Sequence, residues 1–201
     1  MAGVSVAGRG ICIWLTGLSG SGKTTTAMRM RDHVEQAGTV VTLLDGDVVR
    51  EHLFPHLGFT RADRDRNVVG VAWVAGQIVR HGGVAICSLI SPYRVAREQA
   101  RSAIGREHFL EVYVDTPLEI CLARDVKGLY RLAQGGEIKA MTGVSDPYET
   151  PTDPDVTIET VGRSVDQNVG EILRVLHERG FLRDIRASDV AFPPRGDEAI
   201  P

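Results

Sequence analysis

The sequence has few cysteines and no long hydrophobic run, and these two features limit the classes of protein to which it can belong. Three cysteines occur among 201 residues, and no two of them form a C-x-x-C pair. Cys12, Cys87 and Cys121 each lie in an apolar stretch, so we expect buried free thiols, which suit a reducing cytoplasm. No apolar run approaches the ~20 residues that span a bilayer, and the first residues lack the pattern of a secretory signal. We therefore expect a cytoplasmic protein without a membrane partner.

An excess of charge of one sign is also missing. The formal net charge is −3, from 23 basic and 26 acidic residues. The whole-chain charge therefore gives no reason to expect binding to nucleic acid or to an acidic membrane surface. Internal repeats and low-complexity tracts are absent from the sequence. A chain of this length can bury its core without disulfides, which favours one large domain.

Short apolar runs alternate with helical segments along the chain. The runs expected to form strands cover residues 11–16, 40–44, 84–89, 108–114 and 155–158. Helices are expected over 23–37, 61–80 and 94–104, from 116 onward, and over 164–179. Strands that are apolar throughout are typical of a parallel sheet, which is buried on both faces. The sequence therefore predicts an α/β fold: a doubly wound parallel sheet of about five strands with helices on both faces.

Two segments fall outside this alternation. Residues 125–154 contain glycines, prolines and charges without a clear apolar period. Because so long a loop in a compact domain is usually functional, we interpret it as a lid. Residues 183–201 contain paired prolines and mixed charge, which is typical of a loosely ordered extension. We expect a single domain over residues 1–182, followed by this tail.

The most specific local motif is GLSGSGKT, which runs from Gly17 to Thr24 between the first expected strand and the first expected helix. It matches the phosphate-binding loop G-x-x-x-x-G-K-[ST] without a gap. In such a loop, main-chain N–H groups and the N-terminus of the helix face phosphate oxygens. Lys23 would reach the outer phosphates and the Thr24 hydroxyl would coordinate Mg²⁺. The alternative is a flexible Gly-Ser turn, which the flanking strand and helix disfavour. We expect nucleotide contacts from Gly17, Leu18, Ser19, Gly20, Ser21, Gly22, Lys23, Thr24 and Thr25.

Two aspartates follow the second expected strand, in DGD. In a doubly wound sheet this strand end borders the phosphate loop. Asp45 and Asp47 could accept a proton from a substrate hydroxyl or hold water around Mg²⁺. Alternatively, Asp45 forms a turn beside Gly46 and Asp47 caps the next segment. For both acids beside a phosphate loop we favour function, with Lys23, Asp45 and Asp47 as catalytic residues and Thr24 and Asp47 as metal ligands.

Other features of the sequence favour a kinase over a GTPase. The N-K-x-D element that reads guanine is absent, and the third expected strand ends in Cys87-Ser88 rather than in an acid. Beyond the phosphate loop, eight motifs occur in one order: GLSGSGKTT, DGDVVR, LGFTRADRDRN, SLISPYR, VDTPLEICLARD, KGLY, GEIKAMTG and DPYE. Together they resemble the adenylylsulfate kinase family of sulfate assimilation, from about Ile11 to Leu182. DGDxVR, ISPYR and KGLY are more specific than the phosphate loop alone.

The resemblance implies a reaction and its cofactors. Members of this family transfer a phosphoryl group from ATP, with Mg²⁺, to the 3′-hydroxyl of adenylylsulfate. ATP and Mg²⁺ are therefore the expected cofactors and a small nucleotide the expected partner. The family often forms homodimers, so a homodimer is an expectation by analogy.

The resemblance also assigns roles to residues. Asp47 would lie nearest the 3′-hydroxyl and Mg²⁺, supported by Asp45, and Arg124 would stack on the adenine of ATP. Ser91 matches a serine that some members phosphorylate, but we expect it to contact the substrate here. Lys127 and the segment through Thr142 would cover both nucleotides. The implied substrate contacts are Asp45, Arg50, Phe59, Arg64, Asn67, Ile90, Ser91, Lys127, Met141 and Thr142.

The sequence departs from the family at several positions. Two arginines that usually follow the counterpart of Val68 are replaced by Val69 and Gly70. Met141 replaces a lid phenylalanine that normally clamps the substrate base against the counterpart of Phe59. Leu89 replaces a phenylalanine, and Val126 replaces a proline. These changes leave open a related kinase for another modified nucleotide, and a nucleotide-binding regulatory module without catalysis is a further alternative.

Three smaller features are expected to be structural. Trp73 lies in an apolar helical stripe and is expected in the core. Arg97, Arg101 and Arg106 are expected on a solvated surface. His52 and His56 are spaced for a helical metal site, but Pro55 interrupts that spacing, so we expect solvated loop residues.

Overall fold

The computed structural model describes residues 5–6 and 9–183. Its central sheet has five parallel strands in the spatial order β3-β4-β2-β5-β6. They are β2 (Ile11–Thr16), β3 (Val41–Asp45), β4 (Val84–Ser88), β5 (Phe109–Asp115) and β6 (Val156–Glu159). The expected strands agree with these bounds to within one residue at each end. The predicted doubly wound α/β fold is therefore confirmed.

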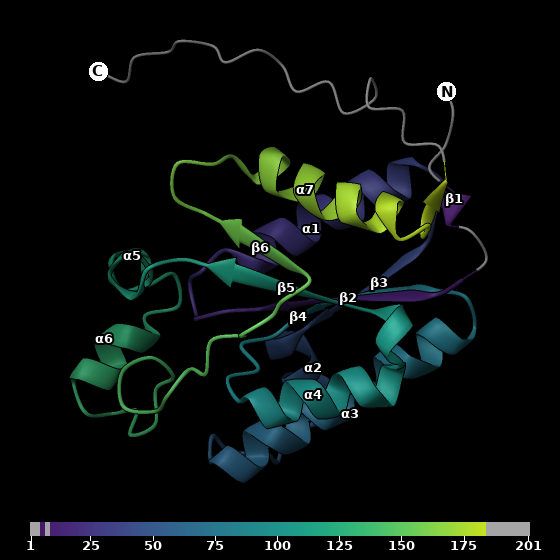
Figure 1. The fold of residues 1–201 in the computed structure, drawn as a ribbon. Coiled ribbons are helices and arrows are strands. Elements are labelled where there is room, and N and C mark those ends of the chain that lie inside the picture. The colour runs from purple at the N-terminus through teal and green to yellow at the C-terminus, as the bar shows by residue number, and fades with distance from the viewer. Residues whose placement is uncertain (1–4, 7–8, 184–201) are drawn as a thin grey trace.

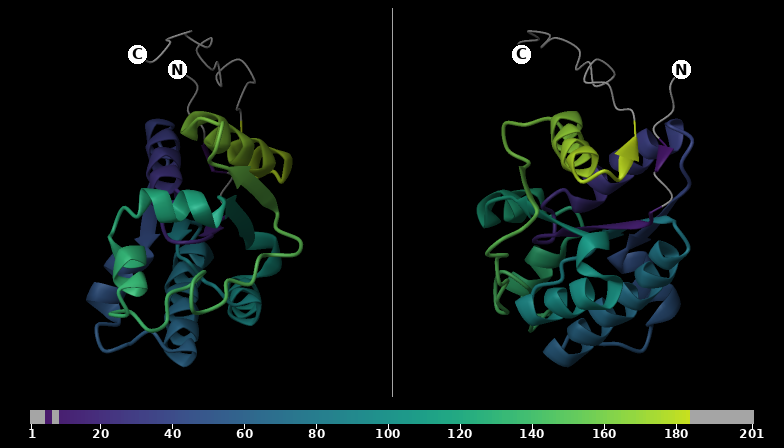
Figure 2. Two further views of the ribbon diagram at one scale, coloured as in Figure 1. Left: turned by 90° about the vertical axis from the view of Figure 1, so that its left-hand side faces the viewer. Right: turned by 45° about the vertical axis from the view of Figure 1, so that its right-hand side comes forward.

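Helices cover both faces of this sheet (Figure 1, Figure 2). On one face lie α1 (Lys23–Gln36) and α7 (Val165–Glu178), and on the other lie α3 (Arg61–Arg80) and α4 (Arg94–Ile104). Successive side chains of β2 point to opposite faces of the sheet, so this strand contributes to the apolar core on each face. Ile13 and Leu15 pack in the cluster that contains residues of α1 and α7, whereas Trp14 packs in the cluster of α3 and α4.

Smaller elements lie mainly beyond the carboxyl ends of the strands. They are α2 (Gly46–Leu53), α5 (Leu118–Arg124) and α6 (Leu129–Gln134), whereas the 3₁₀ helix η1 (Arg106–His108) directly precedes β5 and lies at the amino end of that strand. The short strands β1 (Ser5–Val6) and β7 (Leu182–Arg183) pair antiparallel in a second sheet. Arg183, expected as the start of the tail, is thus the last residue of β7, and residues 184–201 lie outside the described residues.

Residues 125–154 are more structured than a plain loop. Helix α6 begins after Gly128, which has left-handed φ of 66°, and the Asp125 carboxylate accepts hydrogen bonds from the N–H groups of Tyr130 and Arg131. Tyr130, Met141 and Cys121 form a small separate apolar cluster. The sequence did not predict α6 because six residues are too few for a helical period to be evident.

Two expectations about burial are wrong. Trp73 is 66% exposed, because the side of α3 that faces the sheet is formed by Val68, Val71, Ala72, Ala75 and Val79. Arg97 is only 3% exposed and Arg101 is largely buried, because both reach the carboxylate of Glu111 on β5. Arg106 is exposed, as expected.

Other expectations on burial hold. Cys12, Cys87 and Cys121 are buried and free, and His52 and His56 are exposed, although His52 lies within α2. Of the helices in the described part of the chain, none is long and apolar enough to span a membrane.

Candidate active site

A cavity of about 840 Å³ lies at the carboxyl edge of the sheet and gathers most of the residues singled out in the sequence. Its lining comes from the phosphate loop, the start of α2, the loop around Phe59, residues 88–92, the region of Arg124 to Leu129, and the β6–α7 connection. Carboxyl edges of parallel strands are where doubly wound folds bind ligands. The predicted location of the site therefore agrees with the cavity.

The phosphate loop forms the floor of this cavity. Gly22, with φ of 102°, adopts a left-handed conformation immediately before α1, so the chain turns sharply into the helix N-terminus. Lys23 is 8% exposed, and its Nζ donates to the carbonyl of Leu18 at 2.6 Å and lies 3.4 Å from Ser21 Oγ. Burial, and then the positive charge of Lys127, lower the pKa of Lys23 to about 7. An anionic ligand there would restore the charged form of the lysine.

Thr24 and Asp45 meet beside the loop. The Thr24 hydroxyl donates to Asp45 Oδ2 at 2.9 Å and lies 3.3 Å from Ser88 Oγ. Asp45 Oδ1 accepts from the N–H of Asp47 at 3.1 Å. Asp45 is therefore the N-cap of α2, whereas the structural alternative had assigned capping to Asp47.

The oxygens of Thr24 and Asp45 suit Mg²⁺, which prefers oxygen ligands and usually combines one or two carboxylates with substrate phosphates and water. Within residues 5–6 and 9–183 there is no cluster of three His, Cys, Asp or Glu side chains fit to hold a metal by itself. An ion at Thr24 would therefore depend on the phosphates of a bound nucleotide for further ligands.

Asp47 faces the segment of residues 125–154. Its carboxylate contacts the ammonium group of Lys127, and both side chains are half-exposed or more, at 68% and 50%. The two residues come from motifs 80 positions apart in the sequence. The structure thus brings together the DGD and KGLY motifs at the mouth of the cavity.

The far end of the cavity is formed by side chains around Phe59. This ring is 60% exposed, with the guanidinium carbons of Arg50 and Arg64 at 4.9 and 5.8 Å from its centroid. Burial, and then the charge of Arg64, lower the pKa of Arg50. Two neighbouring cations at an exposed aromatic ring favour a ligand that combines a planar base with negative charge.

Two further residues at this end are buried. Arg64 donates from NH1 to Thr142 Oγ1 at 2.9 Å and from NH2 to the Ala140 carbonyl at 2.6 Å, so it holds the chain at these residues against the cavity. Asn67 is 7% exposed and lines the cavity, and its Oδ1 has no protein partner. That oxygen is available to a donor on a ligand, because buried polar atoms normally have a partner.

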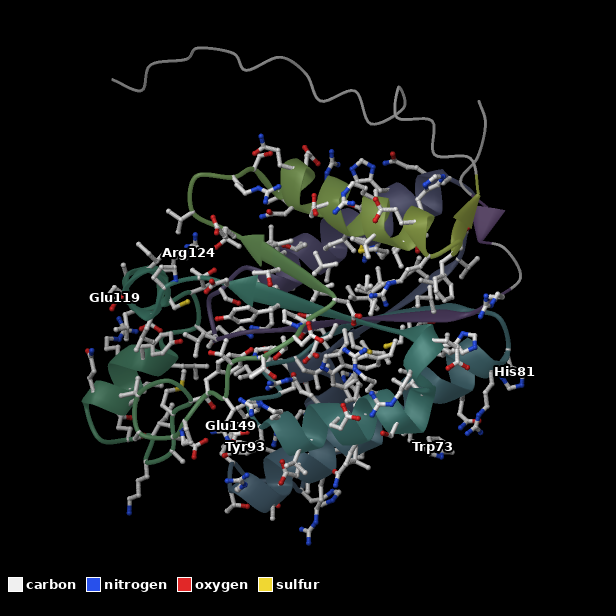
Figure 3. The ribbon with its side chains drawn as sticks, viewed as in Figure 1. Trp73, His81, Tyr93, Glu119, Arg124 and Glu149 are labelled. Carbon is white, nitrogen blue, oxygen red and sulfur yellow. The ribbon has the colours of Figure 1, made fainter. Side chains whose placement is uncertain are left out.

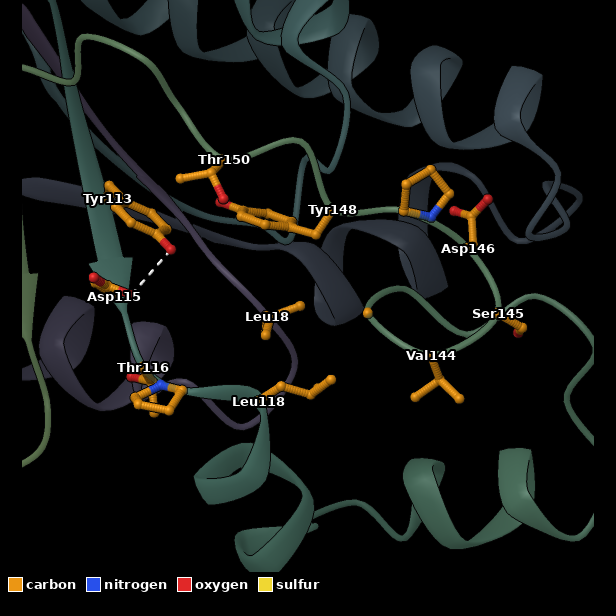
Figure 4. Close-up of a pocket in the computed structure, with 13 residues that line it drawn as sticks. Leu18, Tyr113, Asp115, Thr116, Leu118, Val144, Ser145, Asp146, Tyr148 and Thr150 are labelled. Atoms are coloured by element: carbon orange, nitrogen blue, oxygen red, sulfur yellow. Dashed lines mark hydrogen bonds between the residues drawn. The ribbon is translucent and has the colours of Figure 1, made fainter.

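Some predicted contacts do not line this cavity. Met141 is 5% exposed and packs with Cys121 and Tyr130 rather than across from Phe59, and Thr142 is buried against Arg64. Gly17 and Ser21 also lie outside the lining. Leu18 instead lines a second, more open cavity of about 600 Å³, where Tyr113 stacks on Tyr148 (Figure 4).

Ile90 and Ser91 line the main cavity near the carboxyl end of β4. Ser91 is 2% exposed and has φ of 39°, an uncommon conformation for a non-glycine residue. Its Oγ lies 3.1 Å from Trp14 Nε1, which donates to it. The hydroxyl is thus held inside the protein.

The predicted adenine contact Arg124 lies at the end of α5 (Figure 3). Its guanidinium donates to the Gly20 carbonyl at 3.2 Å and to Thr160 Oγ1 at 3.1 Å. Sequence reasoning missed four lining residues on this side, namely Thr160, Arg163, Val165 and Asn168. The signal that could have found Thr160 is its place directly after β6, at the carboxyl edge of the sheet.

The phosphate loop between β2 and α1, the paired acids at the end of β3 and the five-stranded parallel sheet define a P-loop kinase fold. The family model described as adenylylsulphate kinase matches residues 9–159. The adenylyl-sulfate kinase of Synechococcus sp. (strain JA-3-3Ab) is 46% identical over 175 residues, covering 87% of this chain and 98% of that protein. The adenylyl-sulfate kinase of Halothermothrix orenii is 46% identical over 174 residues, covering 87% and 93%. This chain belongs to the adenylylsulphate kinase family.

Solved structures agree with this assignment. The Mycobacterium tuberculosis APS kinase CysC in complex with AMPPNP and APS superposes with a TM-score of 0.81 and 38% identity, covering 84% of this chain and 98% of that one. The hexameric APS kinase from Thiobacillus denitrificans superposes with a TM-score of 0.67 and 36% identity, covering 87% of this chain and 30% of that longer chain.

Proposed function

We propose that this protein transfers the terminal phosphoryl group of ATP to the 3′-hydroxyl of adenylylsulfate, producing ADP and 3′-phosphoadenylylsulfate for sulfate assimilation. The observation that carries the proposal is a single cavity in which a phosphate loop and Lys23 face Asp45, Asp47 and the open ring of Phe59. Membership of the family supports it, as does the related structure in complex with AMPPNP and APS.

The chemistry follows from these positions. Phosphoryl transfer needs little covalent chemistry from the protein, so catalysis consists of positioning and charge stabilisation. Main-chain amides of residues 17–25 and the Lys23 ammonium would hold the phosphates, and Arg124 would pack on the adenine. Mg²⁺, when bound, neutralises charge on the transferred group. Thr24 would hold the ion with the expected ligand Asp47 and with Asp45, whose carboxylate meets both the Thr24 hydroxyl and the Asp47 amide.

The acceptor would bind at the far end of the cavity. Phe59 offers its face to the adenine, and Arg50 supplies positive charge for the phosphosulfate group. Asn67 Oδ1 would accept from the nucleoside, and Ile90 and Ser91 would border it. Arg64, Met141 and Thr142 would act through the lid segment that they hold in place. The Asp47 carboxylate would accept the proton of the 3′-hydroxyl after exchanging its contact with Lys127 for the substrate.

An ADP-release assay with a panel of nucleotide acceptors tests this proposal. We expect adenylylsulfate to give the highest kcat/KM, and Lys23→Ala to abolish release while serving as the control for contaminating kinases. A higher kcat/KM for another modified nucleotide would favour the alternative, in which the protein is a related kinase for that nucleotide. Absence of ADP release with every acceptor, despite ATP binding, would favour the regulatory alternative.

We also propose that the protein self-associates, as a homodimer. The support is the hexameric relative together with Val69 and Trp73, which are 43% and 66% exposed on one side of α3. Light scattering after size-exclusion chromatography should give twice the monomer mass, and Trp73→Glu should reduce it. A monomeric mass at assay concentrations would contradict the homodimer.

A cytoplasmic location is the last part of the proposal. Three buried free cysteines are its support, since thiols persist in a reducing compartment. Thiol titration of the denatured protein, isolated without reductant, should find three reactive groups. A lower count would contradict the reducing location.

A further inference from the structure

The DPYE motif, residues 146–149, has no role in the transfer described above, yet it is fixed to the acceptor side of the site. It lies in the last part of the segment 125–154, beside the loop that carries Ser91. The N–H of Glu149 donates to the Pro92 carbonyl at 2.8 Å, and the N–H of Arg94 donates to Glu149 Oε2 at 2.7 Å. Tyr93 donates to Asp146 Oδ2 at 2.6 Å. Tyr93 and Glu149 accordingly lie together near the start of α4 (Figure 3).

Arg97 connects the DPYE motif to the loop that carries Ser91. Its side chain is 3% exposed, and its guanidinium makes three hydrogen bonds: Nε to Glu111 Oε1 at 2.9 Å, NH1 to the Ser91 carbonyl at 2.8 Å, and NH2 to the Glu149 carbonyl at 2.7 Å. A planar guanidinium spreads five donors in fixed directions over three nitrogens, whereas a lysine ammonium carries its three donors on one nitrogen and cannot reach the same three separated acceptors. One side chain therefore sets the spacing between the loop that carries Ser91, which we call the acceptor loop, and the DPYE motif.

The backbone conformation of Ser91 depends on the contacts that fix this spacing. A serine at φ of 39° is strained, and such a conformation persists only where surrounding contacts over-determine it. Those contacts are the Arg97 bond to the Ser91 carbonyl, the Trp14 bond to Ser91 Oγ, and the Thr16 hydroxyl, which donates to the Ile90 carbonyl at 2.8 Å. Thr16 is the residue before the phosphate loop, and its hydroxyl also lies 2.9 Å from Tyr148 OH. The acceptor loop, the start of the phosphate loop and the DPYE motif are thus connected by one network of hydrogen bonds.

We propose that Arg97 is a positioning residue for the phosphoryl acceptor: it holds Ser91 and Glu149 so that the acceptor loop and the DPYE motif keep a fixed separation. The proposal rests on the proposed function, because it assigns the acceptor to the Ser91 side of the cavity. A buried ion pair is poor support for stability on its own, since desolvation offsets its attraction. The Arg97–Glu111 pair is better explained by the two site carbonyls that it allows the arginine to reach.

Helix α4 supplies a matched control in Arg101. This arginine bonds the same carboxylate, with NH2 3.2 Å from Glu111 Oε2, and its other partner is Asp155 Oδ2 at 2.9 Å. It is also largely buried, but no hydrogen bond recorded for it in the described structure goes to a carbonyl of the cavity lining or of the DPYE motif. Arg97→Met and Arg101→Met therefore remove equivalent charges, and only the first removes the bridge.

The test compares steady-state kinetics of the two variants. We expect Arg97→Met to raise the KM for adenylylsulfate at least tenfold and to lower kcat, with the Kd for ATP within twofold of wild type. Arg101→Met should lower Tm to a comparable extent but leave the acceptor KM within twofold. Equal kinetic losses in the two variants, or an equal loss of ATP affinity in Arg97→Met, would overturn the proposal. If Arg97→Met does not fold, Arg97→Lys retains the charge for Glu111 and should still raise the acceptor KM; a wild-type KM would contradict the proposal.

Hydrogen exchange separates this proposal from the proposed function. The amides of Arg94 and Glu149 should exchange at least tenfold faster in Arg97→Met or Arg97→Lys than in wild type, and should be unchanged in Arg101→Met. This readout needs no substrate, so it stands even if adenylylsulfate proves not to be the acceptor. Unchanged exchange at both amides in the Arg97 variants would refute the positioning role.

Discussion

The two ends of the active-site cavity are built in different ways. The phosphate end is one continuous run of chain, residues 17–25, whose main-chain amides and buried Lys23 are set by the turn from β2 into α1. The acceptor end is assembled from side chains of separate segments, with Phe59 exposed between Arg50 and Arg64. Its contacts span long distances in sequence, such as the Arg64–Thr142 hydrogen bond between residues 78 positions apart.

This difference separates chemistry from selectivity. A phosphate end formed mainly by one stretch of chain can serve many acceptors, because its amides and Lys23 face the phosphates rather than the acceptor. An acceptor end held by long-range contacts can change its substrate without altering the phosphate loop. We therefore expect substitutions at the junction of the two ends to stop turnover, those at the acceptor end to change the acceptor KM, and some at the phosphate end to affect stability in the opposite direction to activity.

The largest expected effect is at Asp47, where the two ends meet. Asp47→Asn should lower kcat by roughly 10²- to 10³-fold, in the range of lost general-base catalysis. The Kd for ATP should stay near that of wild type, because the amide does not disturb the phosphate loop. Steady-state assays and calorimetric titration with ATP measure the two quantities.

Lys127→Met is the matched comparison for Asp47. It removes the contact between the DGD and KGLY motifs but leaves the carboxylate in place. We expect a smaller loss of kcat than in Asp47→Asn. Equal losses would mean that Asp47 acts only as an anchor for the lid segment, and the assignment of a proton-accepting role would fail.

The next effect tests the acceptor end through an exposed and a buried residue. Phe59→Ala should raise the acceptor KM about tenfold, since stacking on a base contributes about 1–3 kcal/mol, and it should leave Tm nearly unchanged. Met141→Ala should instead destabilise the protein by about 2–3 kcal/mol, as for a buried methionine. Calorimetric melting and acceptor kinetics on both variants check this. If Phe59→Ala kept a wild-type acceptor KM, the proposal that the adenine of the acceptor stacks on Phe59 would be wrong.

A smaller effect concerns protons at the phosphate end. Because the pKa of Lys23 is about 7 in the ligand-free site, most of its amines are neutral at pH 8. Phosphate oxygens favour the ammonium form, so ATP binding at pH 8 should take up close to one proton, and ATP affinity should fall as pH rises above about 7. Titration calorimetry in buffers of different ionisation enthalpy measures the uptake. Lys23→Arg should show none, and absence of uptake in wild type would contradict the depressed pKa.

The same difference decides what the sequence could predict. The five strands, helices α1, α3, α4 and α7, and the phosphate loop follow from local periodicity and from one contiguous motif, so they were predicted closely. Arg97 was predicted to be solvated because its partners, Ser91, Glu111 and Glu149, become neighbours only through folding. In one-dimensional sequence a buried arginine has the same spacing as an exposed one.

The acceptor end and the lid were predicted less well for the same reason. Met141 was expected opposite Phe59, but the structure packs it against Tyr130 of α6, a helix too short to be predicted from its pattern. Thr160 and Asn168 line the cavity only because β6 ends beside β5. The resemblance to a known family supplied Arg50, Phe59 and Asn67, which neither spacing nor composition would have selected.

The smallest expected effect is on stability, and it has the opposite sign to the effect on activity. The pKa of Lys23 in the folded protein, about 7, is below the value of about 10.4 for an unfolded lysine. The unfolded chain therefore binds more protons between these values, and stability should rise with pH across that window. Lys23→Met removes this cost and should stabilise the ligand-free protein at pH 7 by about 1 kcal/mol or more, partly offset by the lost bond to the Leu18 carbonyl. Urea denaturation at pH 7 and 9 measures the difference, which should shrink at the higher pH. A variant less stable than wild type at pH 7 would mean that the buried ammonium is well solvated by its neighbours, and that the phosphate end is not held at the expense of stability.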